Sequence, residues 1–269
     1  MESLSFDPST KTLSLKKSQI PKPAKNEVLI KVAYAGICGT DLHVIEVRFF
    51  LSFVINLYLT LIVHLIPEGL DLAQAALTEP ISCLAHGWDR INPVDVGTRV
   101  LVIGAGIIGL LWAALLHLRG LRKTVTISEP QAKRRETVKK LGVDYEALSS
   151  SELSGREFDL AIDCSGSGPA MEAAVHLLGR GGKLCVFGVA NPKAKMSIEP
   201  FEIYMKELTV VGVNINPFTF PKGLSLVQAM SEKYLQYEKL GIKVYELSRY
   251  QEALAALTKG EINKAVFKL

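Results

Sequence analysis

Apolar and polar residues follow two different patterns along the chain, and the change falls near residue 98. In the first part, residues 12–15 and 27–32 alternate between apolar and polar positions, which predicts short, half-buried β-strands. Regular alternation of apolar strands with helices is typical of a parallel sheet covered on both faces, so an α/β fold is expected for the second part. The predicted strands lie at 98–103, 124–128, 158–163 and 183–187, and the predicted helices at 71–88, 107–119, 131–141 and 169–178.

Residues 47–66 are apolar nearly throughout and fit neither pattern. From 49 to 66 the polar residues recur every four positions and would form one stripe on a helix: Ser52, Asn56, Thr60 and His64. This run reaches the lower limit of a bilayer span, about 17 residues. A buried helix and a segment foreign to the fold are the other interpretations. A single crossing would separate residues 1–46 from the rest of the chain, so we do not expect a membrane span.

The composition is that of an ordinary globular protein. The 269 residues are 48% hydrophobic and 22% charged, which is enough for two domains with buried cores. The net charge of +4 comes from dispersed basic residues, so no nucleic-acid partner is expected. Neither a disulfide framework nor a cysteine knuckle is expected, because the four cysteines lie far apart: Cys38, Cys83, Cys164 and Cys185. A cytoplasmic location is favoured, because no apolar leader follows the N-terminus.

A glycine motif joins the strand at 98–103 to the helix that follows it. Gly104 would make the tight turn, Gly106 would let the backbone approach a pyrophosphate, and Gly109 would let the helix lie close to the strand. The opening of the helix then offers N–H groups and the positive end of its dipole to phosphates. Although three glycines can also merely turn a chain, the strand and helix around them predict a dinucleotide-binding Rossmann unit.

An acidic residue ends the second strand of this unit. Glu129 lies about 20 residues beyond the last glycine, where a carboxylate accepts hydrogen bonds from the adenine ribose hydroxyls. A carboxylate there repels a 2′-phosphate, so the sequence predicts NAD rather than NADP. Arg134 follows closely and weakens this preference.

Several segments resemble the zinc-dependent medium-chain dehydrogenases. Residues 36–43 read Gly-Ile-Cys-Gly-Thr-Asp-Leu-His and resemble a signature near the N-terminus of the alcohol, polyol and threonine dehydrogenases; residues 77–83 are similar to a helix start of the polyol and threonine branch. Further similarity lies at 97–109, 163–166, 181–188, 250–253 and 264–267. The resemblance implies an NAD-binding Rossmann domain at 98–219, a doubly wound parallel sheet. It also implies an incomplete, β-rich GroES-like catalytic domain at 1–97 and 220–269.

The resemblance also implies a reaction, in which zinc helps a secondary alcohol of a polyol or amino alcohol to pass a hydride to NAD. Cys38 takes the place of a zinc thiolate, Glu79 that of an acid at or near the metal, and Thr40 and His43 that of a proton relay. The sheet edge near 205–216 pairs between subunits in this family, which implies a homo-oligomer. The implied cofactor-lining residues are Ile108, Glu129, Arg134, Gly188, Val189 and Val213.

The resemblance stops at residues 47–66. There the family carries a Gly-His-Glu segment with further zinc ligands, followed by a lobe with four cysteines for a structural zinc. A catalytic zinc needs about three protein ligands, and Cys38 with Glu79 makes only two. His64 lacks the Gly-His-Glu context and is expected to be the last polar residue of the apolar run. Without a complete site, Cys38 would be a buried thiol and His43 an ordinary histidine.

Three functions therefore stay open at the level of sequence. The chain is an active NAD-dependent dehydrogenase, an inactive shortened variant that retains NAD binding, or a membrane-associated or assembly protein that uses residues 49–66. The remaining cysteines are expected in the core, and no role is assigned to the remaining histidines: His86, His117 and His176.

Overall fold

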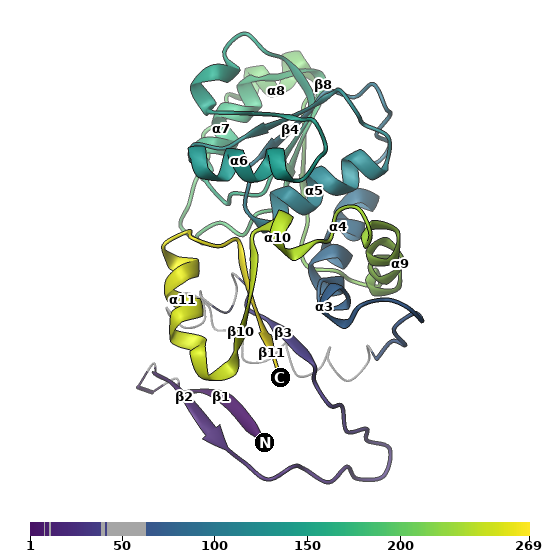
Figure 1. The fold of residues 1–269 in the computed structure, drawn as a ribbon. Coiled ribbons are helices and arrows are strands. Elements are labelled where there is room, and N and C mark those ends of the chain that lie inside the picture. Colours follow the sequence, from purple (N-terminus) through teal and green to yellow (C-terminus); the bar gives the residue numbers. More distant parts are fainter. Residues whose placement is uncertain (8, 11, 39–40, 42–62) are drawn as a thin grey trace. The chain divides into compact units, whose positions relative to one another are not determined.

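The chain divides into two compact units, residues 1–76 with 241–269 and residues 77–240. The computed structural model describes residues 1–7, 9–10, 12–38, 41 and 63–269 (Figure 1). The predictions for Thr40, His43 and residues 47–62 therefore fall outside the described residues. The predicted domain boundaries at 97 and 220 divide a catalytic domain from an NAD-binding domain, and differ from the limits of the compact units. This division by function stays a prediction.

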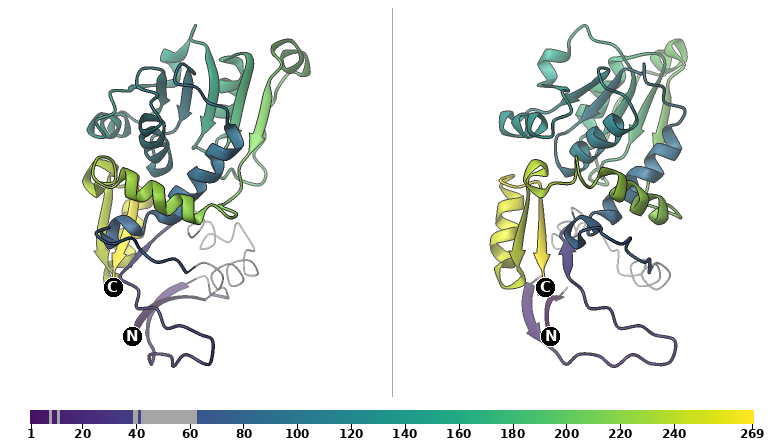
Figure 2. Two further views of the ribbon diagram at one scale, coloured as in Figure 1. Left: turned by 90° about the vertical axis from the view of Figure 1, so that its right-hand side faces the viewer. Right: turned by 45° about the vertical axis from the view of Figure 1, so that its right-hand side comes forward.

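A six-stranded parallel sheet forms the centre of the larger unit, in the order β6-β5-β4-β7-β8-β9 (Figures 1 and 2). The order reverses between β4 and β7, as in a doubly wound sheet, so the predicted Rossmann fold is confirmed. A ligand is expected where the strand order reverses, outside the carboxyl ends of the strands. The strands are β4 (Val100–Ile103), β5 (Val125–Ser128), β6 (Glu146–Leu148), β7 (Phe158–Asp163), β8 (Leu178–Val186) and β9 (Thr209–Gly212).

The helices that the sequence predicts at 107–119, 131–141 and 169–178 begin within one residue of the predicted positions, whereas those at 200–206, 220–230 and 237–240 were not predicted. Ser167 caps α7 by accepting a hydrogen bond from the Ala170 amide, and Ser149 with Glu152 forms a capping box at the short helix η1 (Ser150–Leu153). The predicted helix at 71–88 is instead two helices, α3 (Leu72–Ala75) in the smaller unit and α4 (Thr78–Ile91) in the larger. The others are α5 (Ile107–Leu118), α6 (Ala132–Lys140), α7 (Gly168–His176), α8 (Pro200–Lys206), α9 (Phe220–Met230) and α10 (Tyr237–Leu240).

Close helix contacts explain why residues 77–97 and 220–240 join the sheet. A Cβ at Gly223 of α9 would lie 2.6 Å from the Cβ of Ser82 in α4, so only glycine allows these helices to meet. Gly87 of α4 leaves room for Trp112 of α5, whose ring meets Phe187 edge-on with centroids 5.4 Å apart. Each large apolar side chain buried in this way contributes about 1.5–3 kcal/mol to folding.

The smaller unit combines an antiparallel hairpin with a three-stranded sheet. The hairpin pairs β1 (Glu2–Asp7) with β2 (Thr12–Lys17), as the alternation at 12–15 predicts. Tyr250 is the first residue of the helix α11 (Tyr250–Thr258) and joins it to the hairpin, because its hydroxyl donates to the Leu13 carbonyl at 3.0 Å. The sheet has the order β10-β11-β3, formed by β10 (Ile242–Glu246), β11 (Lys264–Lys268) and β3 (Tyr34–Gly36), with η2 (Leu247–Arg249) and α11 (Tyr250–Thr258) beside it.

The predicted strand at 27–32 is wrong. Residues 27–32 run without β pairing to any described residue; Ala33 accepts a hydrogen bond from the Leu269 amide at 2.9 Å, and the strand β3 begins at Tyr34. The apolar side chains are exposed, from 48% at Val32 to 72% at Val28. Alternation shows that a segment could form a strand, but a strand also needs a neighbour to accept its hydrogen bonds.

Among the described residues, no helix combines the length and apolar character that crossing a bilayer requires.

Candidate functional site

The glycine turn lies between β4 and α5. Gly104 has a φ of +100°, which favours glycine, and its amide donates to the Ser128 carbonyl of β5 at 2.7 Å. A Cβ at Gly109 would lie only 1.9 Å from the Gly104 carbonyl oxygen, so the helix touches the turn directly. A Cβ at Gly106 would meet nothing within 4 Å. The N-terminal end of α5, with Ile108 in its first turn, is thus open to an approaching phosphate.

Glu129 is fixed beside this turn. Its side chain is 2% exposed; Oε2 accepts a hydrogen bond from the Ala105 amide at 2.9 Å, and Oε1 accepts one from Gln131 at the same distance. An ionised carboxylate has about four acceptor positions, and these two backbone donors occupy two of them. The acid ties the end of β5 to the glycine turn.

Two arginines follow the acid on α6, and they differ in how they are held. Arg134 is half-buried, and its Nε is buried without a hydrogen-bond partner among the described residues. Arg135 donates to the carbonyls of Glu129 and Pro130, both at 2.8 Å. Sequence reasoning selected Arg134 and missed Arg135, although the spacing from Glu129 to Arg135 suits a side chain that folds back over a helix start.

The other predicted cofactor residues lie at the carboxyl ends of β8 and β9. The Gly188 amide donates to the Asp163 carbonyl at 2.8 Å, and the Val213 amide donates to Val186 at 3.0 Å. Val189 is 62% exposed. Because parallel strands end on one edge, the structure brings these residues to the same edge as Gly104 and Glu129, where α/β sheets bind ligands.

The two predicted metal ligands belong to different compact units. Cys38 is exposed rather than buried, and a short turn holds its backbone, since its amide donates to Asp41 Oδ2 at 2.7 Å. Glu79 opens α4 in the other unit, and the Cys83 thiol donates to its Oε1 at 3.5 Å. In the part of the chain that the structure describes, no three His, Cys, Asp or Glu side chains form a metal-binding group. Cys38 and Glu79 make two ligands, and a catalytic zinc site needs about three from the protein.

Two further cysteines lie on the sheet near its carboxyl edge. Burial raises the pKa of the Cys185 thiol to about 12, and desolvation raises the pKa of Cys164 well above its usual range, with Asp163 adding to both effects. Thiols with raised pKa values are poor nucleophiles and poor metal ligands. Cys185 is buried as predicted, whereas Cys83 and Cys164 are only half-buried.

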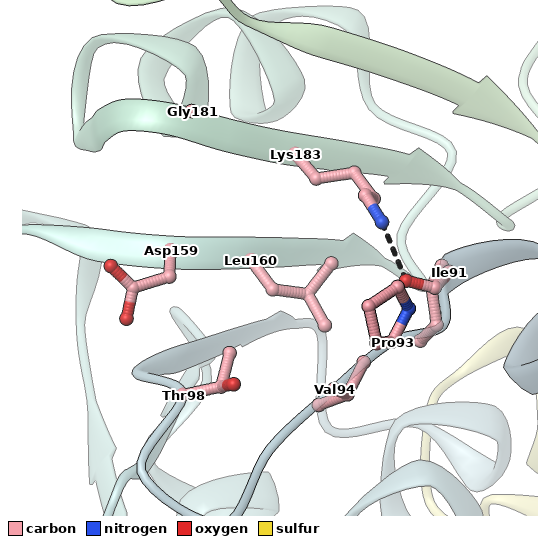
Figure 3. A pocket seen from close by; sticks show the side chains of 8 residues that line it. All are labelled: Ile91, Pro93, Val94, Thr98, Asp159, Leu160, Gly181 and Lys183. Carbon is pink, nitrogen blue, oxygen red and sulfur yellow. Dashed lines mark hydrogen bonds between the residues drawn. The ribbon is translucent and has the colours of Figure 1, made fainter.

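A cavity of about 180 Å³ lies elsewhere in the same unit (Figure 3). Asp159 and Leu160 open β7 and Thr98 precedes β4, so it lies near the amino ends of the strands, away from the glycine turn. Lys183 donates to the Ile91 carbonyl across it at 2.6 Å. Neither Glu129 nor the residues at the start of α5 line this cavity.

Known proteins resemble this chain along much of its length. D-altritol 5-dehydrogenase of Agrobacterium fabrum is 36% identical over 59% of the chain and 48% of its own length. D-arabinitol dehydrogenase 1 of Uromyces fabae is 27% identical over 72% of the chain and 58% of its own length, so the chain spans about half of these two relatives. A sorbitol dehydrogenase of Halalkalibacterium halodurans is 25% identical over 91% of the chain and 92% of its own length.

Solved structures share the fold. A candidate zinc-binding dehydrogenase of Sinorhizobium meliloti 1021, bound to NADP, has a TM-score of 0.79 and 23% identity, with 97% of both chains covered. An alcohol dehydrogenase of E. coli CFT073, complexed with NADH, has a TM-score of 0.81 and 20% identity over 100% of this chain and 99% of its own. Residues 72–268 match the family model described as glucose dehydrogenase C-terminus. The chain belongs to this family, within the polyol branch of the medium-chain dehydrogenases that the sequence resembles.

Proposed function

We propose that this chain binds NAD at the carboxyl edge of its parallel sheet and takes part in hydride transfer from a secondary alcohol of a polyol. Its relatives are polyol dehydrogenases, which supports an oxidoreductase. The observation that carries the cofactor assignment is the hydrogen bond from the Ala105 amide to Glu129, which places a buried carboxylate beside an open helix N-terminus.

Different residues of the chain would bind the pyrophosphate and the adenine ribose of NAD. The amides at the start of α5 would face the pyrophosphate, which the close approach at Gly109 and the open space at Gly106 support. The two remaining acceptor positions of Glu129 would take the adenine ribose hydroxyls, and its charge would disfavour a 2′-phosphate. When bound, the nicotinamide ring supplies the acceptor for a hydride.

The cofactor assignment is tested by calorimetric titration of the purified chain with NAD and with NADP. We expect NAD to bind with measurable heat and NADP to bind more weakly. Absence of heat from both, with a folded chain, would overturn the proposal.

A second candidate is a protein that binds NAD without oxidising alcohols. It is favoured by the lack of a three-ligand group among the described residues. Metal analysis separates the two candidates: about one tightly held zinc per chain, the requirement of a catalytic site, supports the dehydrogenase. An absence of zinc, together with no rise in NADH absorbance across polyols and amino alcohols, supports the second candidate. Thr40 and His43 would act as the proton relay only if the chain is a dehydrogenase.

We further propose that two copies of the chain associate through the sheet edge at β9, in the cytoplasm. β9 is the last strand of the sheet, so one row of its backbone groups has no strand partner among the described residues. Beside it, α8 exposes apolar side chains, with Phe201 71% and Tyr204 76% exposed, and Val210 of β9 is 45% exposed. A second copy would cover this surface.

A further inference from the structure

Asp163, which sequence reasoning left without a role of its own, ends β7 and is fully buried, with 0% of its surface exposed. Its Oδ1 accepts hydrogen bonds from the Ser165 amide at 2.9 Å and the Ser165 hydroxyl at 2.6 Å, and its Oδ2 accepts one from the Gly166 amide at 3.2 Å. Its main-chain carbonyl accepts hydrogen bonds from Phe187 at 3.2 Å and Gly188 at 2.8 Å. One residue therefore joins the turn after β7 to the turn after β8.

The two turns also touch each other. A Cβ at Gly188 would lie 2.5 Å from the Gly166 nitrogen and 2.8 Å from Asp163 Oδ2. A Cβ at Gly166, whose φ is +65°, would lie 2.5 Å from the Val189 carbonyl oxygen. Neither turn can move toward the other, so the position of residues 187–189 depends on the carboxylate that holds residues 165–166.

These turns lie on one side of β4, and Glu129 lies on the other. The strand order places β5, which ends at Glu129, next to β4, with β7 and β8 beyond it. A dinucleotide lies across the point where the strand order reverses, so when its adenosine end is held at β5 its other end extends over β7 and β8. The linked turns after β7 and β8 therefore lie under the nicotinamide half.

We propose that Asp163 is a positioning residue for the nicotinamide half of the cofactor, acting through the turns at 165–166 and 187–189. The inference rests on the proposed binding of NAD. A carboxylate suits this role because it only accepts hydrogen bonds. An amide in its place would direct an NH₂ group at the N–H of Ser165 or Gly166, which would push one turn away.

The experiment compares NAD with ADP, which carries only the adenosine and pyrophosphate, by calorimetric titration of the wild-type chain and Asp163→Asn. We expect the variant to bind ADP within about twofold of wild type and NAD about tenfold more weakly, the effect of one lost buried hydrogen bond. A role confined to stability would change both affinities by the same factor or neither, and either result would overturn the inference.

Asp159→Asn is the matched control. It makes the same substitution on the same strand, but at the amino end, where the carboxylate accepts hydrogen bonds from Arg99. Both affinities should stay at the wild-type values. If Asp163→Asn does not fold, Ser165→Ala replaces it, since it keeps the carboxylate and removes the two hydrogen bonds of the Ser165 hydroxyl, to Asp163 at 2.6 Å and from the Ser167 amide at 3.1 Å. The variant should then bind NAD about threefold more weakly than wild type, with no loss of ADP affinity. A variant that binds NAD as tightly as wild type would overturn the inference.

The two proposals fail in different ways. If the wild-type chain binds neither NAD nor ADP, the proposed function fails and this inference fails with it. If the wild-type chain binds both and Asp163→Asn keeps the wild-type ratio of affinities, only the inference fails.

Discussion

The carboxylate of Glu129 accepts a hydrogen bond from the Ala105 amide at 2.9 Å and so joins the end of β5 to the turn after β4. The contact is buried, and both oxygens of the side chain already serve a backbone donor. This acid is therefore part of the scaffold of the turn as well as a candidate ligand for a sugar.

Glu129→Gln should destabilise the chain and weaken NAD binding together. The amide group of glutamine would face either the Ala105 or the Gln131 amide, leaving one buried donor unpaired at a cost of about 1–3 kcal/mol in the free energy of unfolding. Preference for NAD over NADP should also fall, because the negative charge is gone. Urea unfolding and calorimetry measure these effects, and Glu136→Gln on the exposed surface of α6 is the control. An unchanged preference between the cofactors would contradict the assignment of Glu129.

Gly109→Ala should be among the most damaging small substitutions in the larger unit. The new methyl group would lie 1.9 Å from the Gly104 oxygen, so α5 must move away from β4. Overpacking of this kind costs about 1–3 kcal/mol in the free energy of unfolding. Gly97→Ala makes the same change where a Cβ meets nothing within 4 Å, and it should be close to neutral. Equal stabilities of the two variants in urea would contradict the close contact of helix and turn.

His117 should make the stability of the larger unit depend on pH. Burial, and then the charges of Arg122 and Lys233, lower its pKa from 6.5 to about 4; its Nδ1 lies 2.6 Å from the Tyr234 hydroxyl. Between these pH values the unfolded chain binds a proton that the folded chain does not. The free energy of unfolding should thus be highest above pH 6.5 and fall as the pH drops toward 4, by at most about 3 kcal/mol from this group.

Carboxylates titrate in the same pH range. The informative quantity is therefore the difference in the free energy of unfolding between wild type and His117→Gln. That difference should change with pH from 6.5 to 4. The same comparison with His176→Gln, which removes a half-exposed imidazole paired with Glu202, serves as control. A difference for His117→Gln that stays constant with pH would show that the imidazole titrates normally.

A charge placed on the edge strand should separate the proposed dimer. Val210→Lys puts an ammonium group among the exposed apolar side chains of β9 and α8, where two copies would bring two such charges together. Light scattering should give the mass of a dimer for wild type and of a monomer for the variant. Glu136→Lys on α6 should leave the mass unchanged, and a monomeric wild type would reject the proposed association.

The sequence predicted four of the six strands of the parallel sheet, because the information for them is local, and it missed β6 and β9. The turn at Gly104, the close contact at Gly109 and the acid at Glu129 each depend on neighbours along the chain or on the adjacent strand. Pairing across longer distances was harder: residues 27–32 have the pattern of a strand but no partner among the described residues. Arg134 and Arg135 are of one residue type and adjacent, so only their spacing from Glu129 could have indicated which guanidinium reaches the Glu129 carbonyl.

The predicted metal site depends on contacts that sequence patterns do not supply. Cys38 and Glu79 belong to different compact units, and Thr40 and His43 lie outside the described residues. Asp163 was missed for another reason. Its signal is an acid at the end of a strand, followed closely by Ser165 and Gly166, and such a residue acts through backbone turns that a search for ligands does not consider.

Because Trp112 contacts Phe187, its intrinsic fluorescence can report on the turn after β8. Phe187 directly precedes Gly188, and its ring meets the indole of a fully buried tryptophan at 5.4 Å. The chain has only two tryptophans, and the other, Trp88, lies beneath the guanidinium of Arg119. Displacement of the turn after β8 would alter the surroundings of the Trp112 indole, so intrinsic fluorescence would follow events at this edge without an added dye.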